Sequence, residues 1–169
     1  MVNKVAWITG AGSGIGEASA IKLAAEGFSV VLSGRTKGTL DTVASKCKGQ
    51  VSVKPLDVSN HEDVKAVFEE IISDYGRVDV LVASAGLNAK NRNWHNVSEE
   101  DFDQIIKIDL NGVFYTNRLV LEKMKEQREG LIINISSWAG KYVTTVTGPA
   151  YTAAKHGVNA LTEGINMEA

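Results

Sequence analysis

TGAGSGIG, residues 9–16, is the stretch of sequence that decides the fold, because it joins an apolar run (residues 5–8) to a helical pattern. A strand that ends in glycines and turns directly into a helix directs unpaired backbone N–H groups, and the positive end of the helix dipole, toward one point. Residues without a Cβ are needed there because the backbone turns tightly and a pyrophosphate approaches only where no side chain stands. The stretch therefore predicts a phosphate site; the alternative is a flexible turn between a strand and a helix.

The composition is that of an ordinary single domain. The chain has 169 residues, of which 44% are hydrophobic and 22% charged, with a formal net charge of -2, and we expect one domain over residues 1–169. No basic excess points to a nucleic-acid partner. No signal-peptide core follows Met1 and no apolar run approaches the length of a membrane span, so we expect a cytoplasmic protein with no membrane partner.

Neither thiol chemistry nor a metal is expected. Cys47 is the single cysteine in the sequence, and it lies in a polar stretch without a neighbour to activate it, so we interpret it as an incidental thiol. The three histidines show no metal-ligand spacing.

Apolar periodicity predicts strands that alternate with helices. The expected strands cover residues 5–8, 28–33, 51–56, 78–83 and 131–136, and the expected helices cover residues 15–25, 37–48, 59–75, 98–124 and 150–169. Short β-branched runs such as residues 28–33 are typical of strands covered on both faces. The alternation predicts an α/β fold with a doubly wound parallel sheet, helices on both faces (three layers, α/β/α) and right-handed crossovers.

Local signals predict how three of the helices begin and pack. Ser59 and Glu62 form an expected capping box, and Gly76 ends the same helix. Ser98 is the expected N-cap of the long helix. The expected buried faces are Ile15, Ala18, Ile21, Ala24 and Ala25 in the first helix and Phe102, Ile105, Ile106, Asp109, Val113 and Phe114 in the long one. A carboxylate such as Asp109 is costly to bury unless it is hydrogen-bonded or protonated.

The end of the second strand indicates which dinucleotide is bound. An acid about 20 residues beyond the glycine loop would hold a ribose 2′-hydroxyl, but this chain reads SGRTK at residues 33–37. A guanidinium beside a glycine, as at Arg35, suits a 2′-phosphate instead. The sequence therefore favours NADP(H) over NAD(H). The alternative is that Arg35 and Lys37 are solvated surface charges.

Tyr151 and Lys155 are the candidate reactive pair. They lie four residues apart on an expected helix, so their side chains share a face. A phenol is a poor acid at neutral pH, and a nearby ammonium favours its ionised form. Ser136 and Ser137 end the fifth strand at the carboxyl edge of the sheet, where a hydroxyl could orient a substrate carbonyl.

Taken together, these residues resemble the classical short-chain dehydrogenases/reductases. The resemblance covers essentially the whole chain and is carried by Thr9-Gly10-x-x-x-Gly14-x-Gly16, Asp57-Val58, Ala85-Gly86, Asn134-Ile135-Ser136-Ser137 and Tyr151-x-x-x-Lys155. It implies a Rossmann-like fold and an NAD(P)-dependent oxidoreductase that passes a hydride between the nicotinamide and a small secondary alcohol or ketone. We further expect a homo-oligomer, a dimer or a tetramer.

The resemblance also implies roles for individual residues. Ser137 would polarise the substrate oxygen, Tyr151 would exchange its proton, and Lys155 would bond the nicotinamide ribose and feed a water-linked proton relay. Asp109 stands where the family has an asparagine that holds the relay water, and Asn111 is the alternative. The implied cofactor-binding residues are Gly10, Gly12, Ser13, Gly14, Ile15, Gly16, Arg35, Asp57, Val58, Ser84, Ala85, Gly86, Tyr151 and Lys155.

The sequence departs from the family pattern in three places. Ala83 and Ser84 replace two asparagines after the fourth strand, and the gap from Ser137 to Tyr151 is one residue longer than usual, which leaves open which serine acts. The chain also ends inside the Tyr151 helix, where family members continue through two more strands. We therefore expect a domain incomplete at its C-terminus. The alternative function is a non-catalytic dinucleotide-binding or scaffold protein of the same fold.

Overall fold

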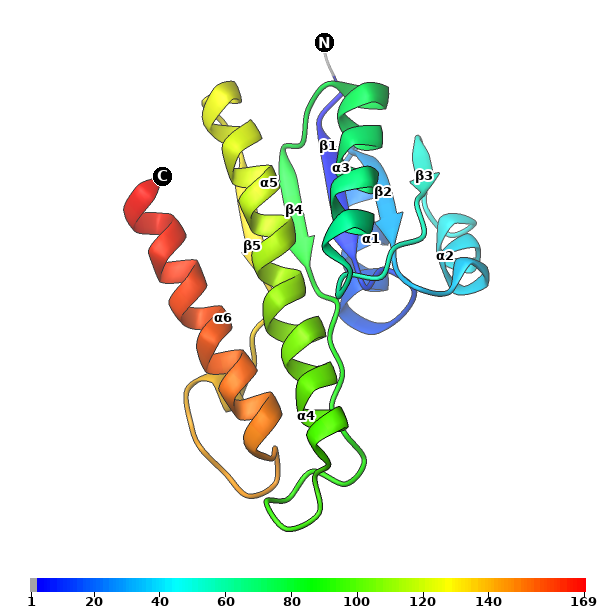
Figure 1. The fold of residues 1–169 in the computed structure, drawn as a ribbon. Helices are drawn as coiled ribbons and strands as arrows, with labels where there is room; N and C mark the ends of the chain where they lie inside the picture. The colour runs from blue at the N-terminus through cyan, green and yellow to red at the C-terminus, as the bar shows by residue number, and fades with distance from the viewer. Residues whose placement is uncertain (1–2) are drawn as a thin grey trace.

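Five parallel strands form one sheet in the order β3-β2-β1-β4-β5 (Figure 1). The computed structural model describes residues 3–169; Met1 and Val2, which begin the segment expected to lack a signal sequence, lie outside the described residues. The strands are β1 (Val5–Thr9), β2 (Ser29–Ser33), β3 (Val51–Val53), β4 (Val80–Ala83) and β5 (Leu131–Asn134). This arrangement confirms the predicted α/β fold class.

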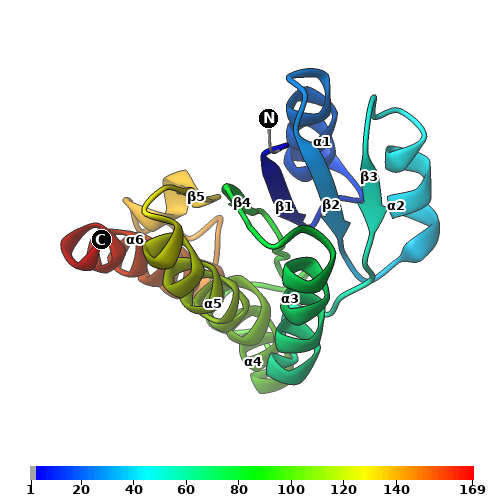
Figure 2. The ribbon, with the colours of Figure 1, turned by 90° about the horizontal axis from the view of Figure 1, so that it is seen from above.

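Helices cover both faces of the sheet (Figure 2). They are α1 (Gly14–Ala25), α2 (Lys37–Ala44), α3 (His61–Tyr75), α4 (Glu99–Ile106), α5 (Gly112–Gln127) and α6 (Pro149–Glu168). Successive strand residues point to opposite faces, so Val5 and Trp7 of β1 pack in a core with α3 and α5. Ala6 and Ile8 pack with α1 and α2 on the other side. Trp7 is fully buried, and its indole Nε1 donates a hydrogen bond of 3.0 Å to Ser33 Oγ.

The start of α3 differs from the prediction. Asn60 is the N-cap, because its side-chain oxygen accepts hydrogen bonds from the backbone N–H groups of Glu62 and Asp63. The Ser59 hydroxyl donates instead to Asp57 Oδ1 at 2.7 Å, so the predicted capping box is wrong. The other end is as predicted, since Gly76 has a left-handed φ of 74° and caps the helix.

Three further boundaries or faces were predicted incorrectly. The first helix, α1, buries the small residues Gly16, Ala20 and Ala24, while Ile15 of the predicted stripe is 60% exposed. The second helix, α2, ends at Ala44, because the following residues wind into tighter turns whose N–H groups donate only three residues back. The third strand, β3, ends at Val53, three residues before the predicted end, although the N–H groups of Lys54 and Leu56 still donate to Leu32 and Gly34.

The long helix is interrupted by a π-helical turn, Lys107–Asn111, between α4 and α5. One extra residue in a turn moves everything after it by about 100° around the helix axis. The predicted apolar stripe is only partly right, and the turn accounts for the part that follows it. Ile105, Asp109 and Val113 are buried, whereas Phe102 and Phe114 are 37% and 43% exposed.

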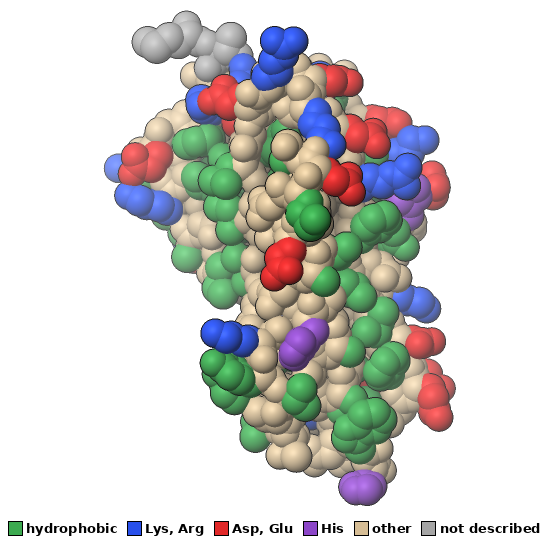
Figure 3. Space-filling view, turned by 90° about the vertical axis from the view of Figure 1, so that its left-hand side faces the viewer, with side chains coloured by type: hydrophobic (Ala, Val, Ile, Leu, Met, Phe, Trp, Pro, Cys, Tyr) green, Lys and Arg blue, Asp and Glu red, His purple; other side chains and the backbone are tan. Residues whose placement is uncertain are grey.

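Within the described residues, β5 is an edge strand of the sheet. Leu131 and Ile133 of this strand are 55% and 39% exposed. Figure 3 looks onto this side of the molecule, where charged side chains gather at the upper end and hydrophobic ones predominate below. Across residues 3–169, no helix has both the length and the apolarity needed to cross a bilayer.

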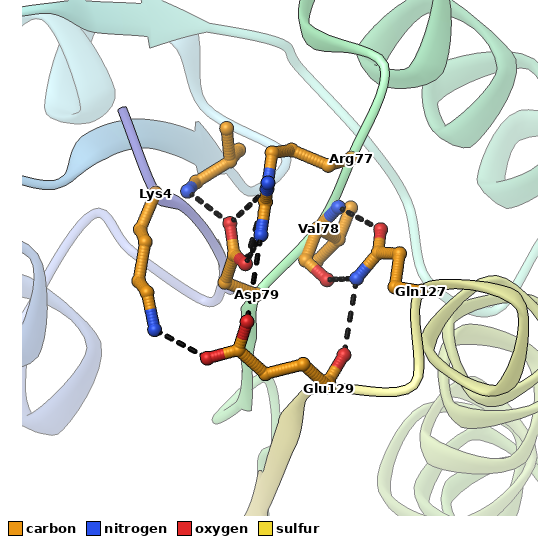
Figure 4. Close-up of polar contacts among 7 residues, drawn as sticks. Lys4, Arg77, Val78, Asp79, Gln127 and Glu129 are labelled. Carbon is orange, nitrogen blue, oxygen red and sulfur yellow. Dashed lines mark hydrogen bonds and ion pairs between the residues drawn. The ribbon is translucent and has the colours of Figure 1, made fainter. Parts of the chain in front are cut away.

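A charged network joins the amino ends of β1 and β4 to the segment before β5 (Figure 4). Asp79 Oδ2 accepts hydrogen bonds from the backbone N–H of Val5 (2.7 Å) and from Arg77 Nε (2.9 Å). Glu129 accepts a hydrogen bond from Lys4 Nζ, and its other carboxylate oxygen lies 3.8 Å from Arg77 Nη2. The network therefore ties three segments that are distant in the sequence.

The network lowers the pKa of Asp79. Burial alone would raise the pKa of this carboxyl group, but the hydrogen bonds from Arg77 and Val5 and the charges of Arg77 and Lys4 outweigh that effect. Asp79 is therefore a carboxylate that stabilises the folded state through its charge.

We expect Asp79→Asn to lower the free energy of unfolding at neutral pH by about 3 kcal/mol, because Arg77 would lose its counter-charge. Since the folded pKa of Asp79 is lowered, its contribution is complete above the unfolded pKa of about 4 and is lost as the pH falls through the folded pKa. Urea unfolding of both proteins at a series of pH values measures this. The difference should shrink toward acid pH.

Asp103→Asn is the matched control, because Asp103 is an exposed acid on α4. This change should alter the free energy of unfolding by less than about 0.5 kcal/mol. A deficit of Asp79→Asn that stays constant from neutral to acid pH would contradict the prediction.

Candidate active site

The glycine loop is packed so tightly at Gly10 and Gly16 that neither position has room for a side chain. Gly10 and Gly14 have left-handed φ values of 64° and 57°. A Cβ on Gly16 would lie 2.3 Å from the Gly10 carbonyl oxygen and 2.6 Å from Ser84 Oγ. A Cβ on Gly14 would meet nothing within 4 Å, so the loop is open on that side. The side chain of Ser13, the N-cap of α1, bonds none of the first N–H groups of the helix, which leaves them available to a phosphate.

A first cavity of about 270 Å³ lies over this loop and the ends of β2 and β4. Most of the predicted cofactor-binding residues line it, namely Gly10, Gly12, Ser13, Arg35, Asp57, Val58, Ala85 and Gly86. Lys37 does not line it, and its Nζ instead pairs with Asp41 Oδ2 at 2.8 Å. Thr36 and Thr39 also line the cavity beside Arg35, and the sequence analysis did not identify either. The residues present therefore fit a dinucleotide.

A second cavity of about 500 Å³ adjoins the first, because Gly86 and Leu87 line both. It brings together the predicted residues Ile15, Ser84, Gly86, Asp109, Tyr151 and Lys155. Gly14, Gly16 and Ser137 are not among its lining residues or those of the first cavity, and neither is Asn111. The carboxyl ends of the strands thus hold one continuous site, as expected where the strand order reverses between β1 and β4.

Lys155 is the buried cation of this site. Its side chain is 5% exposed, and its Nζ donates a hydrogen bond of 3.0 Å to the carbonyl oxygen of Ile135. The same Nζ lies 5.4 Å from the centre of the Tyr151 ring and 3.4 Å from Asp109 Oδ2. The ammonium at 3.4 Å favours negative charge on the Asp109 carboxyl group.

Asp109 is completely buried within the π-helical turn. Its Oδ1 accepts a hydrogen bond of 2.8 Å from the backbone N–H of Leu87, while Oδ2 has no hydrogen bond within residues 3–169. Burial raises the pKa of Asp109, although the charge of Lys155 and the bond from Leu87 oppose that shift. The raised pKa makes this carboxyl group suitable for holding and releasing a proton.

The two serines after β5 differ in how their hydroxyl groups are used. Ser136 lines the second cavity, and its hydroxyl donates to the carbonyl oxygen of Lys155 at 3.3 Å. Ser137 Oγ accepts a hydrogen bond of 3.2 Å from the backbone N–H of Ala139, at the start of the short 3-10 turn Trp138–Gly140. The hydrogen of the Ser137 hydroxyl is therefore left to donate, and its catalytic role stays a prediction.

Ser84 supplies a contact at one of the two positions where the family carries asparagine. Its hydroxyl donates a hydrogen bond of 2.7 Å to the carbonyl oxygen of Thr9, across from β4 to β1. At the other position, Ala83 is buried within β4. Within residues 3–169, no three acids, histidines or cysteines are grouped so that they could hold a metal ion.

Sequence reasoning missed several residues that line the two cavities, among them Thr36, Thr39, Asn88, Arg92 and Thr147. Thr36 follows Arg35 directly and Thr39 lies four residues after it, so the same strand-end argument could have included Thr36. Asn88 and Arg92 belong to a polar loop without periodicity. They enter the site only because the loop packs against the segment before α6, where Asn88 Nδ2 donates to the Thr147 carbonyl oxygen at 3.0 Å.

The fold and the site together define a dinucleotide-binding protein that carries a tyrosine and a buried lysine in the cavity beside its glycine loop. The chain belongs to the short chain dehydrogenase family, whose model matches residues 4–169. An uncharacterized oxidoreductase of Staphylococcus aureus (strain N315) is 37% identical over 171 residues, which cover 99% of this chain and 72% of that protein. The 3-oxoacyl-acyl-carrier-protein reductase FabG of Thermotoga maritima is 37% identical over 163 residues, which cover 95% of this chain and 65% of that protein.

Solved structures agree with this assignment. An alcohol dehydrogenase from the archaeon Thermococcus sibiricus, complexed with 5-hydroxy-NADP, superimposes with a TM-score of 0.92 at 33% identity over 98% of this chain and 71% of that one. A metagenomic short-chain oxidoreductase in complex with NADP gives a TM-score of 0.91 at 34% identity, covering 99% of this chain and 77% of that one.

We expect Asp109→Asn to gain stability relative to the unchanged protein as the pH rises. Because the folded pKa of Asp109 is raised, ionising it costs folding free energy. That cost is absent below the unfolded pKa of about 4 and complete above the folded pKa. Asparagine keeps an oxygen for the Leu87 N–H and carries no charge.

Urea unfolding at pH values between about 4 and 8 measures the difference in free energy of unfolding between the two proteins. The difference should move in favour of Asp109→Asn with increasing pH. A difference that is the same at every pH, or that moves the other way, would show that the pKa of Asp109 is not raised in the folded protein.

Proposed function

We propose that this chain is an NADP(H)-dependent oxidoreductase that interconverts a secondary alcohol and a ketone. The observation that carries the proposal is the placement of Tyr151 and the buried Lys155 in the cavity that continues from the glycine-loop cavity. When bound, the nicotinamide supplies or accepts the hydride. The chain itself has to hold the substrate oxygen, move its proton and bind the cofactor phosphates.

Tyr151 is the proton carrier in this proposal. Its phenol makes no hydrogen bond to any of residues 3–169, so its O–H is available to a substrate oxygen in the second cavity. In the direction of ketone reduction the phenol gives its proton to the substrate oxygen. The Lys155 ammonium, 5.4 Å from the ring centre, then stabilises the phenolate.

Asp109 and Ser137 have separate roles in the proposed proton transfer. Asp109, 3.4 Å from Lys155 Nζ, accepts and returns a proton behind the lysine, so the pair can resupply the phenol. Ser137 lines neither cavity, whereas Ser136 lines the second one; we assign Ser137 as the donor to the substrate oxygen on the family resemblance, and its hydroxyl oxygen already accepts a bond from Ala139.

The preference for NADP(H) over NAD(H) belongs to the same proposal. Arg35 and Thr36 line the first cavity together, and they combine a guanidinium with a hydroxyl group that suits a 2′-phosphate. The Thr39 hydroxyl already donates to the Thr36 carbonyl oxygen at 2.8 Å. Two of the similar structures contain NADP or 5-hydroxy-NADP, which agrees with this assignment.

We expect the purified protein to oxidise NADPH in the presence of ketones, followed by the absorbance of NADPH, and Tyr151→Phe to lower kcat by about 100-fold or more. Phenylalanine keeps the ring that packs beside Lys155 and removes only the O–H. Ser137→Ala and Ser136→Ala are compared in the same assay, because Ser136 lines the second cavity; we expect Ser137→Ala to lower kcat and Ser136→Ala, whose hydroxyl donates to a backbone carbonyl, to lower it less.

The same assay distinguishes the proposed oxidoreductase from a protein that only binds the dinucleotide. Enhanced NADPH fluorescence on binding, without turnover of any ketone or alcohol, would favour a non-catalytic dinucleotide-binding protein. Full activity in Tyr151→Phe would refute the role of the phenol.

Arg35→Ala should raise the Kd for NADPH by roughly 10- to 100-fold, because a charge-assisted bond to the 2′-phosphate is lost. The Kd for NADH should change little. Titration of each cofactor by fluorescence measures both. Lys37→Ala is the matched control, because Lys37 pairs with Asp41 outside the cavity. Equal affinities of the unchanged protein for NADPH and NADH would overturn the preference.

A further inference from the structure

Nearly all polar side chains that line the second cavity are already bonded within the protein. Ser84 donates to Thr9 and Ser136 to Lys155, and Asn88 uses both ends of its amide, on Thr147 and Ala89. Thr147 Oγ1 lies 2.8 Å from Thr152 Oγ1. Lys155 and Asp109 hold each other and two backbone groups. Each of these groups therefore already has at least one partner within the protein.

Two lining side chains have no such partner within residues 3–169. One is the phenol of Tyr151, which the proposed reaction uses. The other is the guanidinium of Arg92, which makes no hydrogen bond or ion pair with those residues. Asp109 is the one acid that lines the cavity, and it is buried against Lys155, so no lining carboxylate neutralises Arg92.

The backbone of Arg92 is held close to the helix that carries Tyr151. Gly148, the N-cap of α6, has a φ of 77°, and a Cβ there would lie 2.1 Å from the carbonyl oxygen of Arg92. This close approach sets the loop directly against the first turn of α6, in which Tyr151 lies. The backbone contact therefore holds Arg92 near Tyr151, and both residues line the second cavity.

Arg92 lines the second cavity and does not line the first, where the cofactor phosphates would bind. Its charge is therefore directed at what the second cavity holds besides the nicotinamide. The remaining lining side chains include the apolar Ile15, Leu87, Ile135 and Val146. A cavity with apolar walls and a single unpartnered cation suits a molecule with a short carbon chain and one negative charge.

We infer that the substrate is an oxo acid or the corresponding hydroxy acid, and that Arg92 binds its carboxylate while Tyr151 faces its carbonyl or carbinol oxygen. This inference rests on the proposed function and names its substrate class. A guanidinium matches the two oxygens of a carboxylate with two parallel hydrogen bonds. One cation balances the single charge of a carboxylate better than the charge of up to -2 on a phosphate group.

The test compares linear oxo acids, from 2-oxobutanoate to 5-oxohexanoate, with their methyl esters. The series varies the distance between the carbonyl and the carboxylate, and each ester keeps the carbonyl without the charge. With the unchanged protein and NADPH, at least one acid should react with a kcat/KM roughly 10- to 100-fold above that of its ester. Arg92→Gln should remove this preference by raising KM for the acid, and Arg92→Lys should restore part of it.

Lys90→Gln is the matched control, because Lys90 is an exposed cation two residues away in the same loop and does not line the cavity. It should leave the preference for the acid intact. The advantage of the acid should also decline with added salt, since Arg92 is exposed to solvent. Equal kcat/KM for every acid and its ester, or an equal loss in Lys90→Gln, would overturn the inference.

A binding measurement separates this inference from the proposed function. The Kd of each oxo acid and ester for the NADPH-loaded protein is measured by calorimetry, which needs no turnover. Tighter binding of an acid than of its ester, lost in Arg92→Gln, supports the carboxylate site even if no compound is reduced, an outcome that would refute the proposed reaction alone. Reduction of ketones without any preference for acids would refute the role of Arg92 alone.

Discussion

The site depends on a place where no side chain fits, between the glycine loop and the end of β4. A Cβ on Gly10 would lie 2.7 Å from the backbone nitrogen of Ala85, and one on Gly16 would meet the Gly10 carbonyl oxygen. This packing places the start of α1 directly against the residues that follow β4, the strand that lies beside β1 in the sheet. Because the strand order reverses there, the first N–H groups of α1 and the backbone after β4 open onto the same cleft.

A second constraint acts on the helix opposite this loop. The π-helical turn Lys107–Asn111 adds a residue to the helix where Asp109 is buried. From there the carboxyl group reaches both the Leu87 N–H, just after β4, and Lys155 on α6. Through Asp109, the turn therefore connects Leu87, which borders both cavities, to α6, which carries Tyr151 and Lys155. A regular helix would place the residues after position 107 in a different register.

Features that follow from glycine positions and apolar periodicity could be predicted, and features that depend on single side-chain or loop contacts could not. The glycine loop, the alternation of strands and helices and the Gly76 cap are local signals, and each is present in the structure. Asn60 caps α3 in place of Ser59, because the Ser59 hydroxyl bonds to Asp57. The apolar periodicity of the sequence gives no sign of this contact. Arg92 enters the site only through its contact with Gly148, which lies 56 residues further along the chain.

Two buried aspartates at opposite ends of β4 show how the number of donors decides the charge state of a carboxyl group. Asp79, at the amino end, accepts a backbone N–H and several Arg77 bonds, and the pKa of this group is lowered despite burial. Asp109, near the carboxyl end, accepts a single backbone bond and faces one ammonium without hydrogen-bond geometry, and burial raises its pKa. Saturation with donors fixes a charge and stabilises the fold, whereas incomplete saturation leaves a group able to change its protonation state. The sheet thus keeps its saturated carboxylate at the end away from the two cavities and its unsaturated carboxyl group where proton transfer would be useful.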